Sequence, residues 1–216
     1  MIPIGDDDST VRTVPLVTYA LVAINIAVFV MELGGGDRFV VEWSFIPRRF
    51  VTHPLGDFRT IFTAMFMHAG LLHLGGNMLY LWIFGNNVED RFGHFRFLVF
   101  YLLCGVAATF AQFVFNFGSR VPNLGASGAI AGVLAAYLVL HPGKWIQVLV
   151  GFFVVPLPAI FVIGIWFGLQ LMNGMGSLAH TTSGGGVAYL AHIGGFVAGL
   201  VYTFRHSGSQ KRRGVG

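Results

Sequence analysis

The chain has little charge. Charged residues make up only 10% of its 216 residues, whereas apolar residues make up 55%, and the mean hydropathy is +0.73. A soluble domain carries roughly 25% charged residues, so this composition argues against a water-soluble enzyme. It also argues against a disordered chain, which combines few apolar groups with many charges. The composition is typical of a polytopic membrane protein.

Cysteine is nearly absent, and several ligand-binding patterns are missing. The single Cys104 cannot close an intrachain disulfide and lies in an apolar run, so we interpret it as a packing residue. The basic residues form no stripe interleaved with aromatic residues, so no nucleic-acid partner is expected. The chain lacks a His-Glu-x-x-His pattern, and His68 and His73 are five residues apart rather than four. We therefore expect no metal site and no other cofactor.

Long charge-free runs indicate where the membrane helices lie. Runs without Lys, Arg, Asp or Glu cover residues 13–31, 60–88, 97–119, 121–143 and 145–204. About 20 apolar residues cross the roughly 30 Å hydrocarbon core, and the last run holds two helices separated by the Gly-rich segment 173–186. We predict an all-α bundle of six transmembrane helices, near 14–32, 70–88, 95–117, 125–141, 147–171 and 187–205.

The six spans divide the chain into three parts. They predict a short cytoplasmic segment at 1–13, a membrane domain at 14–206 with an outer-leaflet loop at 33–69, and a basic cytoplasmic tail at 207–216. Both termini then share one side, which collects eight of the 13 Lys and Arg residues, so we expect both to be cytoplasmic. The acidic start lacks the basic flank of a signal peptide, and no cleaved leader is expected.

Four polar residues are expected at one depth in the membrane. His73 and Asn77, Ser127, and His192 lie on three spans that run inward in parallel, each about 18 to 24 Å from the polar residue at the inner end of its helix. Polar groups inside a bilayer are costly and are functional candidates. The shared layer therefore indicates a site below the outer surface.

This layer can support acyl transfer. A serine becomes a nucleophile when a base takes its proton, and His192 is the candidate base for Ser127. His73, the Asn77 amide and the Ser127 backbone N–H are candidate donors to an oxyanion. No acidic residue follows Asp90, so a Ser–His dyad is expected rather than a triad. The alternative for each residue is a packing, capping or proton-relay role.

Glycines and one acidic residue are the candidate structural residues. Small residues four apart let helices approach closely in lipid. Gly125 and Gly128 flank the serine, and we expect them to admit the substrate and the facing helix. The remaining candidates follow the same spacing on spans two and six: Gly85, Glu89, Gly93, Gly195 and Gly199.

Four motifs together resemble the rhomboid intramembrane serine proteases. They are His68-Ala-Gly-Leu-Leu-His73-Leu-Gly-Gly-Asn77, Gly85-x3-Glu89-x3-Gly93, Gly125-Ala126-Ser127-Gly128, and Ala191-His192-x-Gly194-Gly195-x3-Gly199. Each motif alone is weak, but they occur in the family's order, and the resemblance covers residues 13–206.

The resemblance implies a serine endopeptidase that cleaves other membrane proteins in or near their transmembrane segments. It implies Ser127 as nucleophile, His192 as general base, and His73 and Asn77 at the oxyanion hole, with an acyl-enzyme intermediate. Span five would be the lateral gate or its neighbour, and its Pro156 and Pro158 would break helical hydrogen bonds. The minimal six-helix form implies a bacterial inner-membrane protein whose partners are transmembrane substrates and the lipid bilayer.

The chain departs from the family pattern in two places. Phe58-Arg59 stands where the family often has Trp-Arg, so we expect the anchoring of the first loop to differ from the family pattern. Ala131 stands where an aromatic residue often packs against the histidine, so Tyr189 is a candidate replacement. Two other functions stay open: a client-binding relative without protease activity, and a small channel or transporter. Retention of Ser127 and His192 argues against the first, and the lack of acids and repeats in the spans argues against the second.

Overall fold

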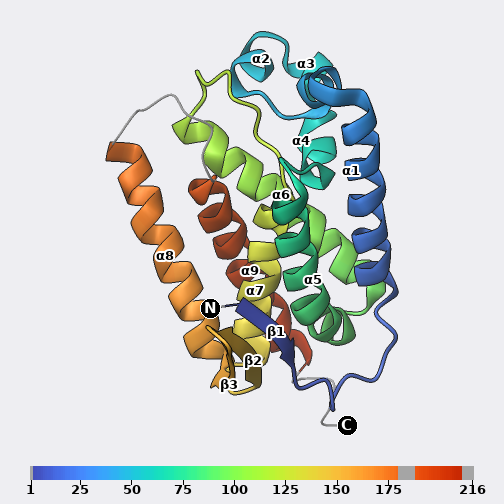
Figure 1. Cartoon of the computed structure of the whole chain (residues 1–216), viewed down its shortest axis with the longest axis vertical. Coiled ribbons are helices and arrows are strands. Elements are labelled where there is room, and N and C mark those ends of the chain that lie inside the picture. Colours follow the sequence, from blue (N-terminus) through green and yellow to red (C-terminus); the bar gives the residue numbers. More distant parts are fainter. Residues whose placement is uncertain (1, 180–187, 211–216) are drawn as a thin grey trace.

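The computed structural model describes residues 2–179 and 188–210, most of which are helical (Figure 1). In chain order the elements are β1 (Ile2–Asp6), α1 (Leu16–Trp43), α2 (Pro47–Thr52), α3 (Pro54–Asp57), α4 (Thr60–Thr63), the 3₁₀ helix η1 (Ala64–Phe66), α5 (Leu71–Phe92), α6 (His94–Phe115), α7 (Ser127–Leu140), β2 (Trp145–Val150), β3 (Phe153–Pro158), α8 (Ala159–Ala179) and α9 (Tyr189–Gln210). The predicted helical bundle is thus confirmed, with a small sheet added.

Helix α7 lies in the middle of the bundle and packs against α5, α6 and α9 (Figure 1). Every residue from Gly128 to Tyr137 is buried. This burial follows from the sequence, because α7 has no charged residue and a helix that is apolar all round belongs in an interior. Its 14 residues span about 21 Å, less than the roughly 30 Å of a hydrocarbon core. If the C-terminal end of α7 reaches one membrane surface, its N-terminal end must therefore lie within the hydrocarbon core.

The six main helices alternate in direction. In Figure 1, α1, α6 and α8 run upward, whereas α5, α7 and α9 run downward. Among the described helices, α1 and α6 are long and apolar enough to cross a membrane, and α7 and residues Ala159–Met175 of α8 are shorter apolar helices. The structure is therefore a mostly helical membrane bundle.

The expected outer loop at 33–69 is largely helical, which corrects the end of the first span. Helix α1 continues past residue 32 to Trp43, with a kink at Gly36 where φ is 57°. The short helices α2 to α4 then cap the upper end of the bundle (Figure 1). Arg59 lies over the Trp43 ring at 4.3 Å, so this loop contains a tryptophan–arginine contact although the two residues are not adjacent in sequence.

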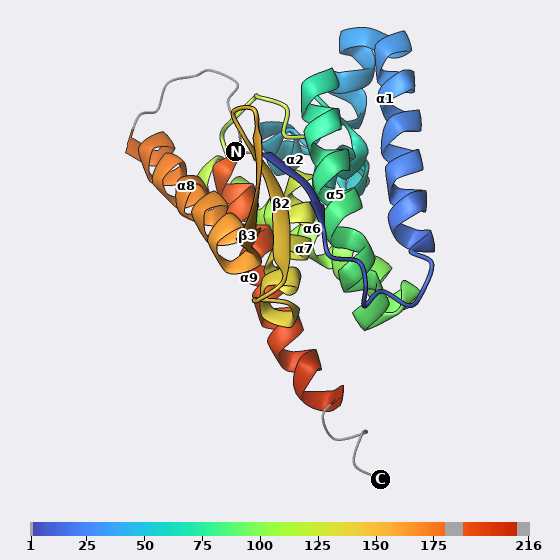
Figure 2. The same cartoon turned by 60° about the horizontal axis from the view of Figure 1, so that its bottom comes forward.

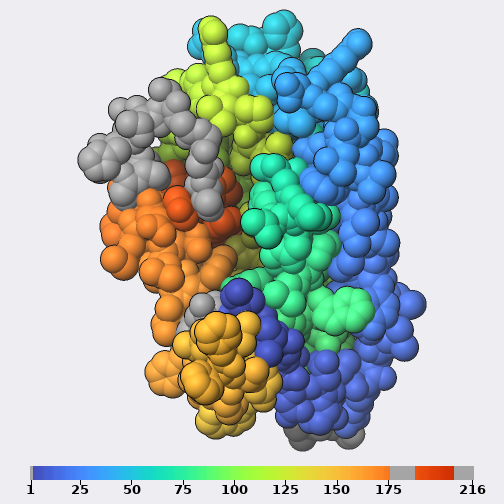
Figure 3. Space-filling view, in the orientation of Figure 1, coloured from blue at the N-terminus to red at the C-terminus, as the bar shows by residue number. Residues whose placement is uncertain are grey.

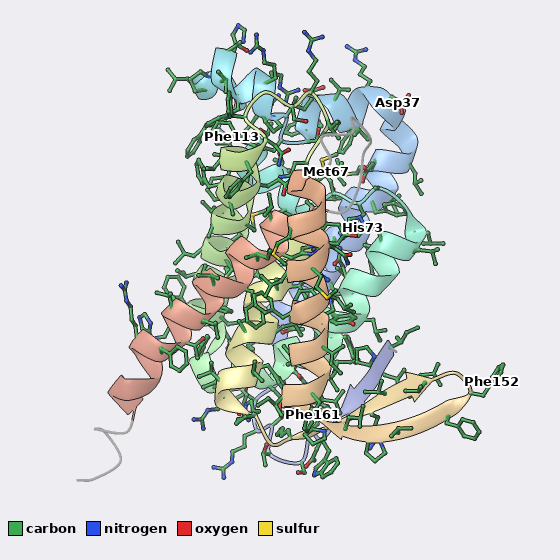
Figure 4. All side chains as sticks on the ribbon, turned by 90° about the vertical axis from the view of Figure 1, so that its left-hand side faces the viewer. Asp37, Met67, His73, Phe113, Phe152 and Phe161 are labelled. Carbon is green, nitrogen blue, oxygen red and sulfur yellow. The ribbon has the colours of Figure 1, made fainter. Side chains whose placement is uncertain are left out.

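The prediction of span five at 147–171 is wrong over its first half. Residues 145–158 form the antiparallel hairpin β2–β3, and the helix begins only at Ala159. The hairpin projects from the bundle and carries Phe152 at its tip (Figure 4). Pro156 and Pro158 therefore lie in β3 and break no helix. Strands are favoured here by the Val-rich sequence and by Gly151, which turns the chain at φ 61°.

The N-terminal segment is part of the same sheet, so the all-α prediction needs correction. Strand β1 pairs antiparallel with β2, giving the order β1-β2-β3 (Figure 2). Side-chain hydrogen bonds also hold β1 to the helices. The Tyr137 hydroxyl of α7 donates to the Asp6 carboxylate at 2.6 Å, and the Asn87 amide of α5 donates to the same carboxylate at 2.9 Å. The beginning of the chain is thereby fixed to the end of α7.

Two other predicted boundaries differ from the structure. The Gly-rich segment at 173–186 is helical as far as Ala179, and its residues 180–186 lie outside the described part. Helix α9 continues to Gln210, beyond the predicted domain end at 206. The last six residues of the predicted tail also lie outside the described residues.

Candidate active site

Ser127 is the first residue of α7. The first hydrogen bond of that helix runs from the Ile130 N–H to the Ala126 carbonyl, so the Ser127 N–H precedes the ladder. The approach to the helix is fixed by Gly125, whose N–H donates to the Ala64 carbonyl at 2.9 Å and whose φ is +132°. A side chain is strained at this φ, and a Cβ would lie 2.9 Å from Cε1 of His73. Glycine at 125 therefore lets His73 approach the serine.

His192 of α9 is in hydrogen-bond contact with Ser127. The distance from Ser127 Oγ to His192 Nε2 is 2.8 Å, and His192 is 7% exposed. His192 is thus largely shielded from water, whereas Ser127 is partly exposed, and a hydrogen bond in such a partly buried setting is stronger than one in water. The geometry matches that of a nucleophile and its base.

Glycines bring α7 and α9 this close. A Cβ at Gly195 would overlap the Gly128 carbonyl oxygen and lie 2.8 Å from its carbon, and a Cβ at Gly199 would lie 2.7 Å from Cα of Gly132. The two backbones are therefore in direct contact, with no room for a methyl group between them. Since Gly128 follows the serine, this contact sets the distance between Ser127 and His192.

His73 and Asn77 lie one turn apart on α5 (Figure 4 labels His73). The Ala69 N–H points at His73 Nδ1 at 3.4 Å, which leaves the proton on Nε2, the nitrogen near Gly125. The Asn77 side chain is 7% exposed, and among the described residues its Nδ2 has no hydrogen-bond partner. Two donors on α5 thus remain available, and that of His73 lies beside Gly125, next to the serine.

Three of the residues expected to be structural, Gly85, Glu89 and Gly93, lie toward the other end of α5. The buried Glu89 carboxylate accepts hydrogen bonds from the N–H groups of Val17 and Thr18 and from the Thr18 hydroxyl, at 2.7 to 2.9 Å. A carboxylate at the N-terminus of α1 also suits the helix dipole. Gly85 faces the Thr18 side chain, where a Cβ would lie 3.0 Å away. Gly93 ends α5 at φ 77°.

Comparison with known proteins gives the family. The model of the Rhomboid domain matches residues 55–209. The chain belongs to the rhomboid family. Its relatives include the mitochondrial Rhomboid protein 1 of Saccharomyces cerevisiae, 31% identical over 189 residues, and the Rhomboid protease GluP of Bacillus subtilis, 31% identical over 192 residues. These matches cover 85% and 86% of this chain, but only 51% and 34% of the relatives.

A plant relative is likewise matched over most of this chain but over a small part of its own length. RHOMBOID-like protein 1 of Arabidopsis thaliana is 31% identical over 144 residues, which is 67% of this chain and 33% of that protein. The chain therefore spans about half or less of these relatives, and its similarity to them concerns the shared membrane-embedded region.

Two residues of this rhomboid that contact His192 were missed by the sequence analysis. Gln170 of α8 places Oε1 2.8 Å from His192 Nδ1. Trp166, one turn earlier, lies with its ring 5.9 Å from the imidazole at an interplanar angle of 35°. Tyr189, the expected replacement for the missing aromatic residue, lies farther away at 6.5 Å and edge-on. The aromatic packing that Ala131 cannot give is thus supplied mainly by α8.

A second buried pair supports the start of α5. His68 is 1% exposed, its N–H donates to the Glu32 carboxylate at 3.0 Å, and its ring lies 5.1 Å from that of His73. Glu32 therefore orders the segment that leads to His73 and Asn77.

Within residues 2–179 and 188–210, no group of three or more His, Cys, Asp or Glu side chains could hold a metal ion.

Proposed function

We propose that this rhomboid is an intramembrane serine endopeptidase that cleaves other membrane proteins in or near their transmembrane segments. The observation that carries the proposal is the 2.8 Å contact between Ser127 Oγ and His192 Nε2 inside a membrane bundle. The protease named among the relatives, GluP, supports the same reaction class.

The chemistry follows from the geometry. Ser127 Oγ attacks the carbonyl carbon of the substrate while its proton passes to His192 Nε2. The oxygen of the tetrahedral intermediate becomes negative, and the candidate donors to it are His73 Nε2–H, the unpartnered Asn77 Nδ2 and the Ser127 N–H. The imidazolium then gives its proton to the leaving amine, which leaves an acyl-enzyme. Water, deprotonated by His192, hydrolyses this ester and restores the serine.

The fold supports six spans with both termini on the cytoplasmic side. The six main helices alternate in direction, and in Figure 1 both β1 and the end of α9 lie in the lower half of the bundle, away from the short helices α2 and α3 at its upper end. The start of α7 then lies in the outer half of the membrane. A site at this depth needs access for substrate and water, and the first turns of α9 are visible between α5 and α8 (Figure 3). A bacterial inner membrane stays the predicted location.

The test is cleavage of a model single-span substrate in proteoliposomes. Wild type should cut it, and Ser127→Ala and His192→Ala should each abolish cutting while retaining the thermal stability of the protein. The matched controls are Ser119→Ala, in the loop before α7, and His206→Ala, near the end of α9; both should cut normally. Binding without cutting by wild type would contradict the proposal and favour a client-binding function.

A further inference from the structure

Gln170 is the polar side chain by which α8 reaches the dyad. Its Oε1 lies 2.8 Å from His192 Nδ1, and His192 Nε2 lies 2.8 Å from Ser127 Oγ. Three side chains from three helices therefore form one chain of contacts. Because an amide oxygen only accepts hydrogen bonds, the imidazole proton must lie on Nδ1 in this arrangement.

The position of that proton decides whether His192 can act as a base. A neutral imidazole carries one N–H, and a proton on Nε2 would prevent that nitrogen from accepting the serine proton. In soluble serine proteases a buried aspartate selects the productive tautomer. Here no acidic residue follows Asp90 in the chain, and an amide does the same without placing a charge in the membrane, which is costly.

We propose that Gln170 is a positioning residue for His192, which holds the imidazole in the tautomer and orientation that Ser127 requires. The proposal rests on the proposed protease function and adds a third member to the dyad. Trp166 packs against the same imidazole one turn away, so α8 fixes both the plane of the ring and its proton.

The hydrogen bond between Gln170 and His192 depends on the position of α8. Helix α8 packs mainly on α9 and much less closely than α7 does (Figure 1). The Gln170–His192 hydrogen bond forms only while α8 lies against α9 at this level. A movement of α8 away from the bundle would therefore release the His192 ring, so the base is fully oriented only when α8 is in place.

The experiment compares Gln170→Met, which keeps the length of the side chain but removes the acceptor, with Gln170→Glu, which keeps an oxygen at Oε1. We expect Gln170→Met to lower kcat for the model substrate about 10- to 100-fold, or about 1.4 to 2.7 kcal/mol, with KM within about twofold of wild type. The rate at which a fluorophosphonate labels Ser127 should fall by a similar factor. Gln170→Glu should restore most of kcat. The control is Leu169→Ala, an exposed neighbour on α8, which should leave kcat unchanged.

The outcomes separate this proposal from the proposed function. Wild-type kcat in Gln170→Met, together with an inactive Ser127→Ala, would overturn the positioning role and leave the protease intact. A raised KM with unchanged kcat would also overturn it, because α8 would then serve substrate binding. If Gln170→Met and Gln170→Glu lost kcat to the same extent, and both also melted at a lower temperature than wild type, Gln170 would have a structural role only. Cleavage by Ser127→Ala would instead contradict the proposed function.

Discussion

Gly195→Ala should open the contact between α7 and α9 and thereby separate the dyad. The added Cβ would overlap the Gly128 carbonyl oxygen and lie 2.8 Å from its carbon. Ordinary carbon–carbon contacts lie at about 3.5 to 4.0 Å, so the backbones must separate by about 1 Å. Both obstructing groups are backbone atoms, and no side chain can rotate away to relieve the overlap.

The expected losses of stability and of kcat follow from the same contact between α7 and α9. Overpacking of this kind costs about 1 to 3 kcal/mol. Because Gly128 follows Ser127, the 2.8 Å distance from Ser127 Oγ to His192 Nε2 would approach about 4 Å, beyond the range of a hydrogen bond. A misplacement of about 1 Å can cost on the order of 100-fold in rate, and we expect a loss of that size in kcat.

The assay is substrate cleavage in proteoliposomes, combined with thermal unfolding in detergent. Gly164→Ala is the matched control, because the new methyl group on α8 would have no atom of another element or of a more distant side chain within 4 Å. It should retain wild-type cleavage and stability. A Gly195→Ala protein that melts at the wild-type temperature and cuts at more than half the wild-type rate would refute the argument that the backbone contact sets the dyad distance.

Three further predictions concern other parts of the molecule. Glu89→Ala should lower the free energy of unfolding by about 2 to 4 kcal/mol, measured by thermal unfolding, because three donors of α1 lose their acceptor; equal stability would contradict that capping role. Gly125→Ala should lower kcat on the order of 100-fold, since its Cβ would displace His73; an unchanged kcat would place His73 outside the oxyanion hole. Burial raises the pKa of the Asp6 carboxyl to about 6, and the Tyr137 hydroxyl opposes the shift. A carboxyl whose pKa is raised in the folded state makes the fold less stable as pH rises through this range. Asn cannot ionise, so the free energy of unfolding of Asp6→Asn relative to that of wild type should increase by about 1 to 2 kcal/mol between pH 4 and 7, after allowance for solvent screening. Unfolding curves across this pH range test it, and a constant difference would refute it.

The parts of the fold that follow from charge and small residues could be predicted from the sequence. Charges are costly in the hydrocarbon core, so the gaps between them indicated helices close to α5, α6, α7 and α9. The glycine spacing on spans four and six indicated the close approach that the structure shows between α7 and α9. The pairing of Ser127 with His192 followed because both were placed at the same depth.

The hairpin β2–β3 could not be predicted by the same reasoning. Residues 145–158 are as apolar as a membrane helix, and apolarity alone does not separate a buried strand from a helix. The local signals were the Val-rich composition, Gly151 and the two prolines, which were interpreted as breaks inside a helix. The partner strand β1 is more than a hundred residues away, and nothing in the local pattern indicates that pairing.

The role of Gln170 was missed for a related reason. The predicted span ended at residue 171, which placed Gln170 at the outer end of a helix, whereas α8 runs from Ala159 to Ala179 and places it well inside. A signal was present, because Gln170 is the single amide or charged residue between Ala159 and Met172, and a polar residue within a span is a functional candidate. A correct start for α8 would have placed it beside His192.

The most direct test of the central claim is the site of covalent labelling by a fluorophosphonate, mapped by peptide mass spectrometry. Such a probe reacts with a serine whose proton a neighbouring base accepts. The account predicts an adduct on Ser127 in the wild type and none in His192→Ala, although both proteins unfold at similar temperatures. Equal labelling of Ser127 in His192→Ala, or an unlabelled Ser127 in a wild type that still cleaves substrate, would contradict it.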